Sequence, residues 1–330
     1  MEIDKISQPI PIVFIHKGDS WYLPYVLRQA LLVNNNSHVT LISDVKANSD
    51  IEGLQISLIS DLYTDLAQEF TQIYKHLSSN SPNYEMFCWL RWFYLLEYME
   101  KNNINQVFYL DSDVLIFTNP NHISRLYPEI KDSCAFLIPK QEHTSYYWYS
   151  GGHISYWTQD ILRRFCEFTI DTFKRQNLLN MYNQKWNWHI NNKVSGGICD
   201  MTTLYLFSRE YSDCVINFLL NNREGCFDVN FNSSSNFLEN EYELQNNHKK
   251  TIFQDNKPLG LRRDKTIIHF HNIHFQGWAK TLIPNYYRGK YFKEKNKHYL
   301  DRAMYTLQAP LKTMIKPIFH KIELLLKSFC

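Results

Sequence analysis

Two acidic side chains that follow an apolar run are the residues best placed for chemistry. Gln106 to Leu110 predicts a buried strand, and Asp111 and Asp113 follow it with one residue between them. Side chains at i and i+2 of an extended chain face the same way. A hard divalent cation binds such oxygen ligands, bridges them to a diphosphate and stabilises that group as it leaves. The pattern predicts a Mg²⁺ or Mn²⁺ site, and the competing interpretation is a pair of acids in a solvated turn.

The segments before this pair alternate between strand and helix patterns. Apolar runs predict strands at Ile10 to Ile15, His38 to Ile42 and Leu54 to Ile59. Tyr22 to Val33 has helical periodicity, and Tyr84 to Glu100 is apolar nearly all round, which is typical of a helix buried on most sides. Alternating strands and helices favour a parallel sheet that binds ligands at the carboxyl ends of its strands. The fold class is therefore α/β.

The second half of the chain continues this pattern less regularly. We expect short strands near 135–138, 152–157 and 267–270, and helices over about 160–174 and 201–210. Residues 221–256 are rich in Asn, Ser and charge, which indicates a long loop or insertion. Two helices are expected over 295–330.

Four segments occur in an order that resembles the GT-A glycosyltransferases, most of all glycosyltransferase family 8, which includes glycogenin and bacterial lipopolysaccharide galactosyltransferases. Tyr109 to Leu115 resembles the family's yLDsDvl segment, and Ser150 to Gly152 resembles its small-residue strand. Asp200 to Leu204 takes the place of a D-Q-D-x-[LI]-N segment without its glutamine. His274 to Lys280 matches the first seven positions of HFxGxxKPW. The resemblance covers roughly residues 10–285.

The resemblance implies a GT-A fold, a Rossmann-like nucleotide-sugar-binding fold with a mostly parallel central sheet. It assigns residues 1–290 to the transferase domain, with a donor-binding half at about 1–120 and an acceptor half at about 121–290. Residues 291–330 form a C-terminal helical extension. The implied activity is metal-dependent transfer of a hexose from a UDP-sugar to a glycan or glycolipid, with retention of the anomeric configuration, in the synthesis of cell-surface polysaccharide.

The resemblance also implies roles for site residues. The carboxylates of Asp111 and Asp113 ligate Mn²⁺ or Mg²⁺, and His274 completes the protein ligands, with His271 as the alternative histidine. Gly277 and Lys280 approach the diphosphate, because glycine allows close backbone contact and lysine supplies a positive charge. Further donor-binding candidates lie at strand ends and in the glycine pair: His16, Tyr22, Asp44, Ser112, Gly151 and Gly152.

Two charged residues have a structural and a functional interpretation each. Arg91 lies in an apolar helix and needs an anionic partner, either near Asp111 or on a donor phosphate, or a structural acid such as Glu97. Asp200 opens a predicted helix, where it would cap the helix or act catalytically. In the catalytic interpretation it stabilises positive charge at the anomeric carbon or takes a proton from the acceptor.

Other classes fit the sequence less well. Asp111 to Leu115 also resembles the nucleophile motif of haloacid-dehalogenase-like phosphatases, but no downstream acidic pair for magnesium follows it. A sugar nucleotidyltransferase would need a long glycine-rich loop after the first strand. A non-catalytic sugar-binding protein would not need acids, histidine and lysine together.

Net charge, cysteine content and hydropathy indicate which binding partners and which cellular compartment to expect. A net charge of +2 gives no reason to expect nucleic-acid binding. Seven widely spaced cysteines favour reduced thiols in a cytoplasmic protein. No signal peptide or spanning apolar run occurs. Residues 312–329 could form a basic amphipathic helix, which predicts either packing on the protein or peripheral contact with the inner membrane face.

Overall fold

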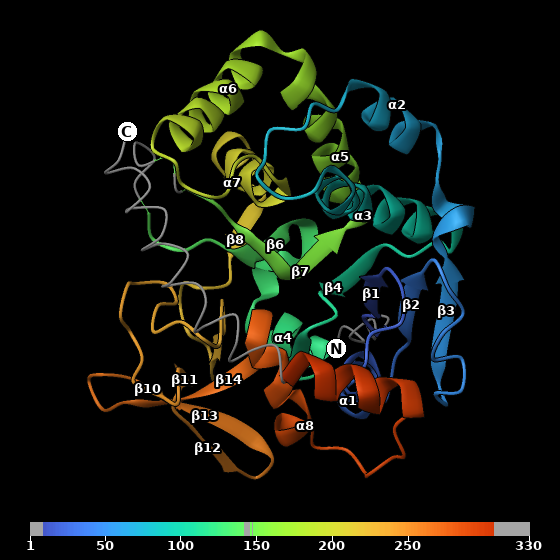
Figure 1. The fold of residues 1–330 in the computed structure, drawn as a ribbon, viewed down its shortest axis with the longest axis vertical. Helices are drawn as coiled ribbons and strands as arrows, with labels where there is room; N and C mark the ends of the chain where they lie inside the picture. Colours follow the sequence, from blue (N-terminus) through green and yellow to red (C-terminus); the bar gives the residue numbers. More distant parts are fainter. Residues whose placement is uncertain (1–8, 142–145, 147, 307–330) are drawn as a thin grey trace, which may run out of the picture.

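A seven-stranded sheet forms the centre of the molecule (Figure 1). The computed structural model describes residues 9–141, 146 and 148–306. The strands of the sheet are β1 (Ile12–His16), β2 (Val39–Ser43), β3 (Leu54–Leu58), β4 (Gln106–Leu110), β6 (Cys134–Leu137), β7 (Gly151–Thr158) and β8 (Val215–Asn217). Their order is β3-β2-β1-β4-β7-β6-β8, and only β7 runs antiparallel to its neighbours. The predicted α/β fold with a mostly parallel sheet is confirmed.

Helices cover both faces of this sheet (Figure 1). One face carries α2 (Asp65–Ile73), α3 (Pro82–Lys101), α5 (Gln159–Lys174), α6 (Gln176–Asn191) and α7 (Asp200–Glu210). The other face carries α1 (Leu23–Val33), α4 (Pro120–Leu126) and α8 (Ile283–Tyr286). Each face has its own buried core. As expected, α3 is buried on most sides, because its tryptophans Trp89 and Trp92 fill the core against the sheet.

A second, smaller sheet brings distant parts of the chain to the end of β4. Its order is β12 (Thr251–Gln254), β13 (Lys257–Leu261), β14 (Ile267–His274) and β5 (Val114–Ile116), and β9 (Cys226–Phe227) also pairs with β14. In the antiparallel pair of β14 with β5, His274 lies opposite Val114. This register places the end of β14 directly beside the turn that contains Asp111 and Asp113.

The prediction of a long loop over residues 221–256 is partly wrong. That segment contains β9, β12 and the hairpin of β10 (Leu244–Gln245) with β11 (His248–Lys249). Most of these strands have only two residues, too few to show a periodic pattern. Their turns use asparagines in the left-handed conformation, such as Asn246 and Asn247.

The chain after α8 returns along α1. Short 3-10 helices occur at Ile59–Leu62, Pro128–Asp132 and Gly277–Leu282, and residues 296–306 are helical. The amphipathic segment 312–329 lies outside the described residues. Among the helices that the structure describes, none combines the length and the apolar character needed to cross a membrane.

Candidate active site

The turn between β4 and β5 holds the two acids of the D-x-D motif in different surroundings. Asp111 accepts hydrogen bonds on Oδ1 from Arg91 Nη1 at 2.7 Å and from the Tyr109 hydroxyl at 2.6 Å. Asp113 lies 2.6 Å from Lys280 Nζ through Oδ2 and 3.4 Å from His274 Nε2 through Oδ1. The solvated-turn interpretation is therefore wrong, because the side chain of Asp113 is only 14% exposed and both acids have charged partners.

The partners of Asp113 determine its charge. Burial alone would raise the pKa of Asp113, but the charges of His274 and Lys280 outweigh it and hold that pKa below its usual range. Burial would lower the pKa of Lys280 and of His274, and the Asp113 carboxylate raises both instead. Asp113 is thus an ionised carboxylate that faces two cationic or metal-ligating groups.

A backbone carbonyl fixes the orientation of the His274 ring on the side away from Asp113. Its Nδ1 lies 2.8 Å from the carbonyl oxygen of Val229, and since a carbonyl only accepts, Nδ1 carries the proton. Nε2 is then the nitrogen that faces Asp113. The ring also stacks on buried His153, with centroids 3.9 Å apart.

A buried ion pair supports the backbone of His274. Asp228 Oδ2 accepts the amide of His274 at 3.0 Å, and Oδ1 accepts from Lys249 Nζ. Both side chains of the Asp228–Lys249 pair are fully buried. Sequence reasoning missed this pair because both residues lie in the segment that was predicted as a loop.

His271 lies on the other side of β14. Its Nδ1 is 3.0 Å from Thr118 Oγ1 and its Nε2 is 3.1 Å from the carbonyl of Arg223. Positions 271 and 274 differ by three residues, so they face opposite sides of a strand. Of the two histidines, the structure brings His274 to Asp113.

Arg91 joins the D-x-D turn to α7. Besides its bond to Asp111, it donates from Nε to Asp200 Oδ2 at 3.1 Å and from Nη2 to the same oxygen. Its guanidinium is 11% exposed, and the two carboxylates raise its pKa although burial would lower it. Glu97, the structural alternative, instead lies 3.3 Å from Lys101. The partners of Arg91 are therefore the two acids of the site.

Asp200 is the first residue of α7 and is not its cap. Cys199 occupies the N-cap position and forms a capping box with Thr202. The Asp200 side chain is 3% exposed, and its Oδ2 also accepts from the indole of Trp92 at 2.9 Å. Asp200 is thus not the N-cap, although its Oδ1 accepts the amide of Met201 at 2.9 Å, and Arg91 and Trp92 hold its other oxygen, Oδ2.

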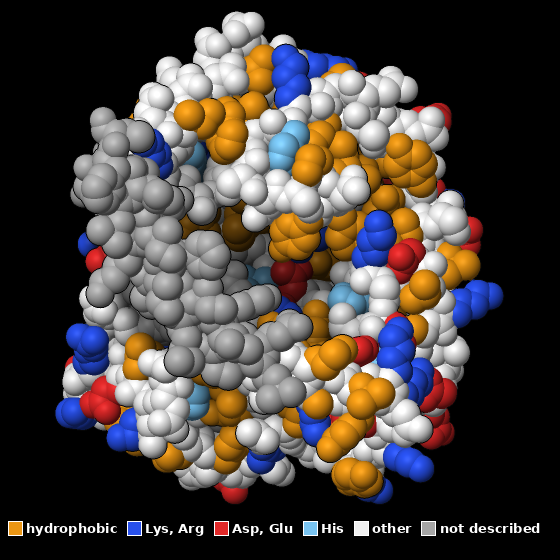
Figure 2. All heavy atoms as spheres, in the orientation of Figure 1, with side chains coloured by type: hydrophobic (Ala, Val, Ile, Leu, Met, Phe, Trp, Pro, Cys, Tyr) orange, Lys and Arg blue, Asp and Glu red, His pale blue; other side chains and the backbone are white. Residues whose placement is uncertain are grey.

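A pocket of about 390 Å³ opens beside these groups, and we call it the donor pocket. On the face drawn in Figure 2, a hollow near the centre contains acidic, basic and histidine side chains. The predicted residues that line the donor pocket are His16, Tyr22, Arg91, Asp111, Ser112, Asp113 and Lys280. One face of the first turns of α3 also lines it, through Asn83, Tyr84, Phe87 and Cys88. Sequence reasoning missed this face, although the spacing of its residues is helical.

The other predicted donor-binding residues, Asp44, Gly151, Gly152 and Gly277, do not line the donor pocket. Asp44 accepts the amide of Gly18 at 2.7 Å and so orders the loop after β1. Gly152 is buried, and a Cβ there would meet the Trp92 ring at 2.8 Å. Its neighbour Gly151 is buried at the start of β7. Gly277 has φ +57°, a left-handed backbone that favours glycine although a Cβ there would meet no atom within 4 Å.

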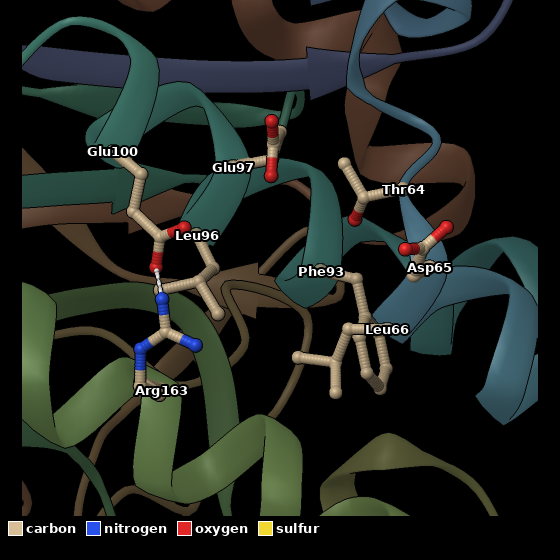
Figure 3. A pocket seen from close by; sticks show the side chains of 8 residues that line it. All are labelled: Thr64, Asp65, Leu66, Phe93, Leu96, Glu97, Glu100 and Arg163. Atoms are coloured by element: carbon tan, nitrogen blue, oxygen red, sulfur yellow. Dashed lines mark hydrogen bonds and ion pairs between the residues drawn. The ribbon is translucent and has the colours of Figure 1, made fainter.

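A second pocket, of about 310 Å³, lies between α2, α3 and α5 (Figure 3). Its basic residue Arg163 is paired with Glu100, as the dashed line in Figure 3 marks. It contains none of the motif residues. The donor pocket is therefore the candidate active site.

No known family model matches the sequence, and no curated protein matches it significantly. Comparison with solved structures finds glycosyltransferases. Mouse xyloside xylosyltransferase 1 is 11% identical with a TM-score of 0.45, over 63% of this chain and 84% of that one. The galactosyltransferase LgtC, solved with donor and acceptor sugar analogues, is 13% identical with a TM-score of 0.38, over 63% and 73%. The PaToxG glycosyltransferase is 11% identical with a TM-score of 0.36, over 62% and 71%. At such low identities and TM-scores, the function of this chain has to come from its own side chains.

Proposed function

We propose that this chain is a glycosyltransferase of the GT-A type that moves a sugar from a nucleotide sugar, a UDP-sugar by its motif order, to a glycan or glycolipid. The observation that supports it most is the meeting of Asp113 with His274 and Lys280. Lys280 is 167 positions from Asp113 in the chain, yet the β5–β14 register brings both to one pocket. A nucleotide diphosphate needs such a cluster, since its two negative charges must be neutralised before an acidic motif can face it.

The residues fit a divalent cation, although the described residues contain no group of three or more His, Cys, Asp or Glu arranged to hold one. Neighbouring ligands of a cation with bonds of about 2.1 Å lie about 3 Å apart. Asp113 Oδ1 and His274 Nε2 are 3.4 Å apart, so they suit two positions of one coordination sphere. Asp111 would add its Oδ2, because both of its hydrogen bonds end on Oδ1. Bound Mn²⁺ or Mg²⁺ would act as a Lewis acid toward the leaving diphosphate.

The other charged residues of the site have roles that follow from the sign of their charge. Lys280 places a positive charge at the phosphate end of the donor pocket, and Tyr22 lies beside it, with its ring centroid 5.5 Å from Nζ. Arg91 holds Asp200 in one orientation, so that its carboxylate can stabilise positive charge at the anomeric carbon or receive the acceptor's proton. Retention of configuration is the stereochemical proposal that accompanies the motif order.

Release of nucleoside diphosphate tests the proposal. Full-length protein is incubated with a panel of nucleotide sugars and Mn²⁺, with and without glycan or glycolipid acceptors. We expect nucleoside diphosphate to appear for one donor, faster with an acceptor, and NMR of the first product to show a retained anomer. Asp200→Asn should lower the rate at least about 100-fold. Hydrolysis of p-nitrophenyl phosphate without release of nucleoside diphosphate would instead indicate the phosphatase alternative.

A further inference from the structure

The helix formed by residues 296–306 follows the His274–Lys280 motif in the chain and contacts α1, where Arg302 Nη1 lies 3.4 Å from the Tyr25 hydroxyl. In Figure 1 it is the red helix in front of α1. The segment that leads to it packs on α1. Phe292 contacts Tyr25, with ring centroids 4.7 Å apart, and Lys295 lies 3.2 Å from Asp50. The helix is therefore anchored to the domain and is not a free extension.

One end of this helix contacts the loop that follows β1. His298 is 1% exposed, and its Nε2 lies 2.9 Å from Asp19 Oδ1. This loop, residues 17–22, supplies Lys17 and Tyr22 to the donor pocket. From the other end of the helix, the ring of Tyr305 packs on Trp21 of the same loop, with centroids 6.2 Å apart.

The other end contacts the loop that follows β14. The Tyr305 hydroxyl donates to the carbonyl oxygen of Gly277 at 2.6 Å. Gly277 opens the turn that carries Lys280 to Asp113. Burial raises the pKa of Tyr305, against a smaller lowering by the charge of Lys280.

We propose that helix 296–306 braces the donor pocket, with His298 and Tyr305 as positioning residues. His298 and Tyr305 hold the loop after β1, and Tyr305 also holds the turn at Gly277. Both loops contribute residues to the donor pocket, and no other described side chain hydrogen-bonds to the Gly277 carbonyl. Elsewhere the turn is held by buried Ala279 and by Asn232, which donates to the carbonyl of Gln276 at 2.9 Å, whereas a Cβ on Gly277 would meet no atom within 4 Å. The hydrogen bond from Tyr305 is therefore an added restraint at Gly277 itself, and through this turn helix 296–306 helps to position Lys280. The consequence for the donor rests on the proposed function.

The test compares Tyr305→Phe with Tyr299→Phe. Both variants lose one hydroxyl on the same helix, but Tyr299 is 59% exposed. We expect Tyr305→Phe to raise KM for the nucleotide sugar by about two- to tenfold with kcat nearly unchanged, the loss of one hydrogen bond. Tyr299→Phe should match the wild type. A change in kcat alone, or equal KM values for the two variants, would overturn the proposal.

A second readout needs no donor. Amide hydrogen exchange of residues 275–280 should become faster in Tyr305→Phe than in Tyr299→Phe, since the turn loses its restraint. Equal exchange in the two variants contradicts the brace. If the wild type binds no nucleotide sugar, the proposed function fails, while the exchange comparison still decides whether the helix restrains the turn.

Discussion

The two acids of the D-x-D motif are two residues apart, yet they belong to regions with opposite charge balance. Asp113 faces Lys280 and His274, so cationic or metal-ligating groups exceed carboxylates there. Asp111 and Asp200 share the single guanidinium of Arg91, so carboxylates exceed cations there. In the proposed transfer, the first region would face the leaving diphosphate, and Asp200 of the second region would face the positive charge that develops on the sugar.

The largest expected effect is a loss of unfolding free energy when Arg91, the cation shared by Asp111 and Asp200, is removed. Arg91→Ala leaves two carboxylates without their shared partner, and removing one member of a buried ion pair costs about 3–5 kcal/mol. The control is Arg163→Ala, which breaks an ion pair whose arginine is 49% exposed and should cost about 0–1 kcal/mol. Urea unfolding measures both. Equal losses would mean that Arg91 is no more important to the fold than a surface arginine.

The cation of the diphosphate region should matter to turnover more than to folding. Lys280→Ala removes the positive charge next to Asp113, and we expect donor consumption to slow about 100-fold. Lys174→Ala, a lysine paired on the surface with Glu69, provides the matched control and should keep wild-type turnover. A Lys280→Ala enzyme with full activity would place the diphosphate elsewhere.

Backbone geometry in the same region predicts a smaller effect. Gly277→Ala forces a Cβ into the left-handed region and should cost about 1–2 kcal/mol of unfolding free energy. Gly53→Ala has a similar conformation, with φ +78°, and should cost about as much. Only the Gly277 variant should also weaken nucleotide binding. If both glycine variants bind nucleotide like the wild type, the close approach of this turn to phosphate is excluded.

The smallest effect is a dependence of stability on pH. Burial lowers the pKa of His274 and Asp113 outweighs it, so the folded-state pKa lies above the usual 6.5. The stability that the charged His274 contributes to the fold is fully present below about pH 6.5 and is lost as the pH rises through the raised pKa of the folded state. Without metal, the stability advantage of the wild type over His274→Gln should therefore be greater near pH 6 than near pH 9. An advantage that grows toward pH 9 would reverse the sign and contradict the pairing with Asp113.

Local sequence patterns predicted the helices and strands whose own residues show a clear period. The apolar runs of β1, β2 and β4 and the aromatic α3 came from the sequence because each is long enough to show its period. α2 and α6 were missed, because α2 has only nine residues and two of the buried positions of α6 are the polar residues Lys185 and His189.

Contacts between distant segments were beyond local patterns. The approach of His274 to Asp113 depends on the β5–β14 register, and the Asp228–Lys249 pair depends on strands of two residues. His271 is different, because strand alternation alone could have separated it from His274. That Arg91 pairs with both Asp111 and Asp200 could not be predicted from local patterns either, since Asp200 is 109 positions away in the chain.

Calorimetric titration of UDP into the full-length protein tests the central claim most directly. The account predicts binding in Mn²⁺ that becomes at least about tenfold weaker in EDTA and in Asp113→Asn, because the diphosphate then faces the acids without its cation. Asp213→Asn, at an exposed acid, should bind like the wild type. Undiminished affinity both in EDTA and in Asp113→Asn would contradict the account.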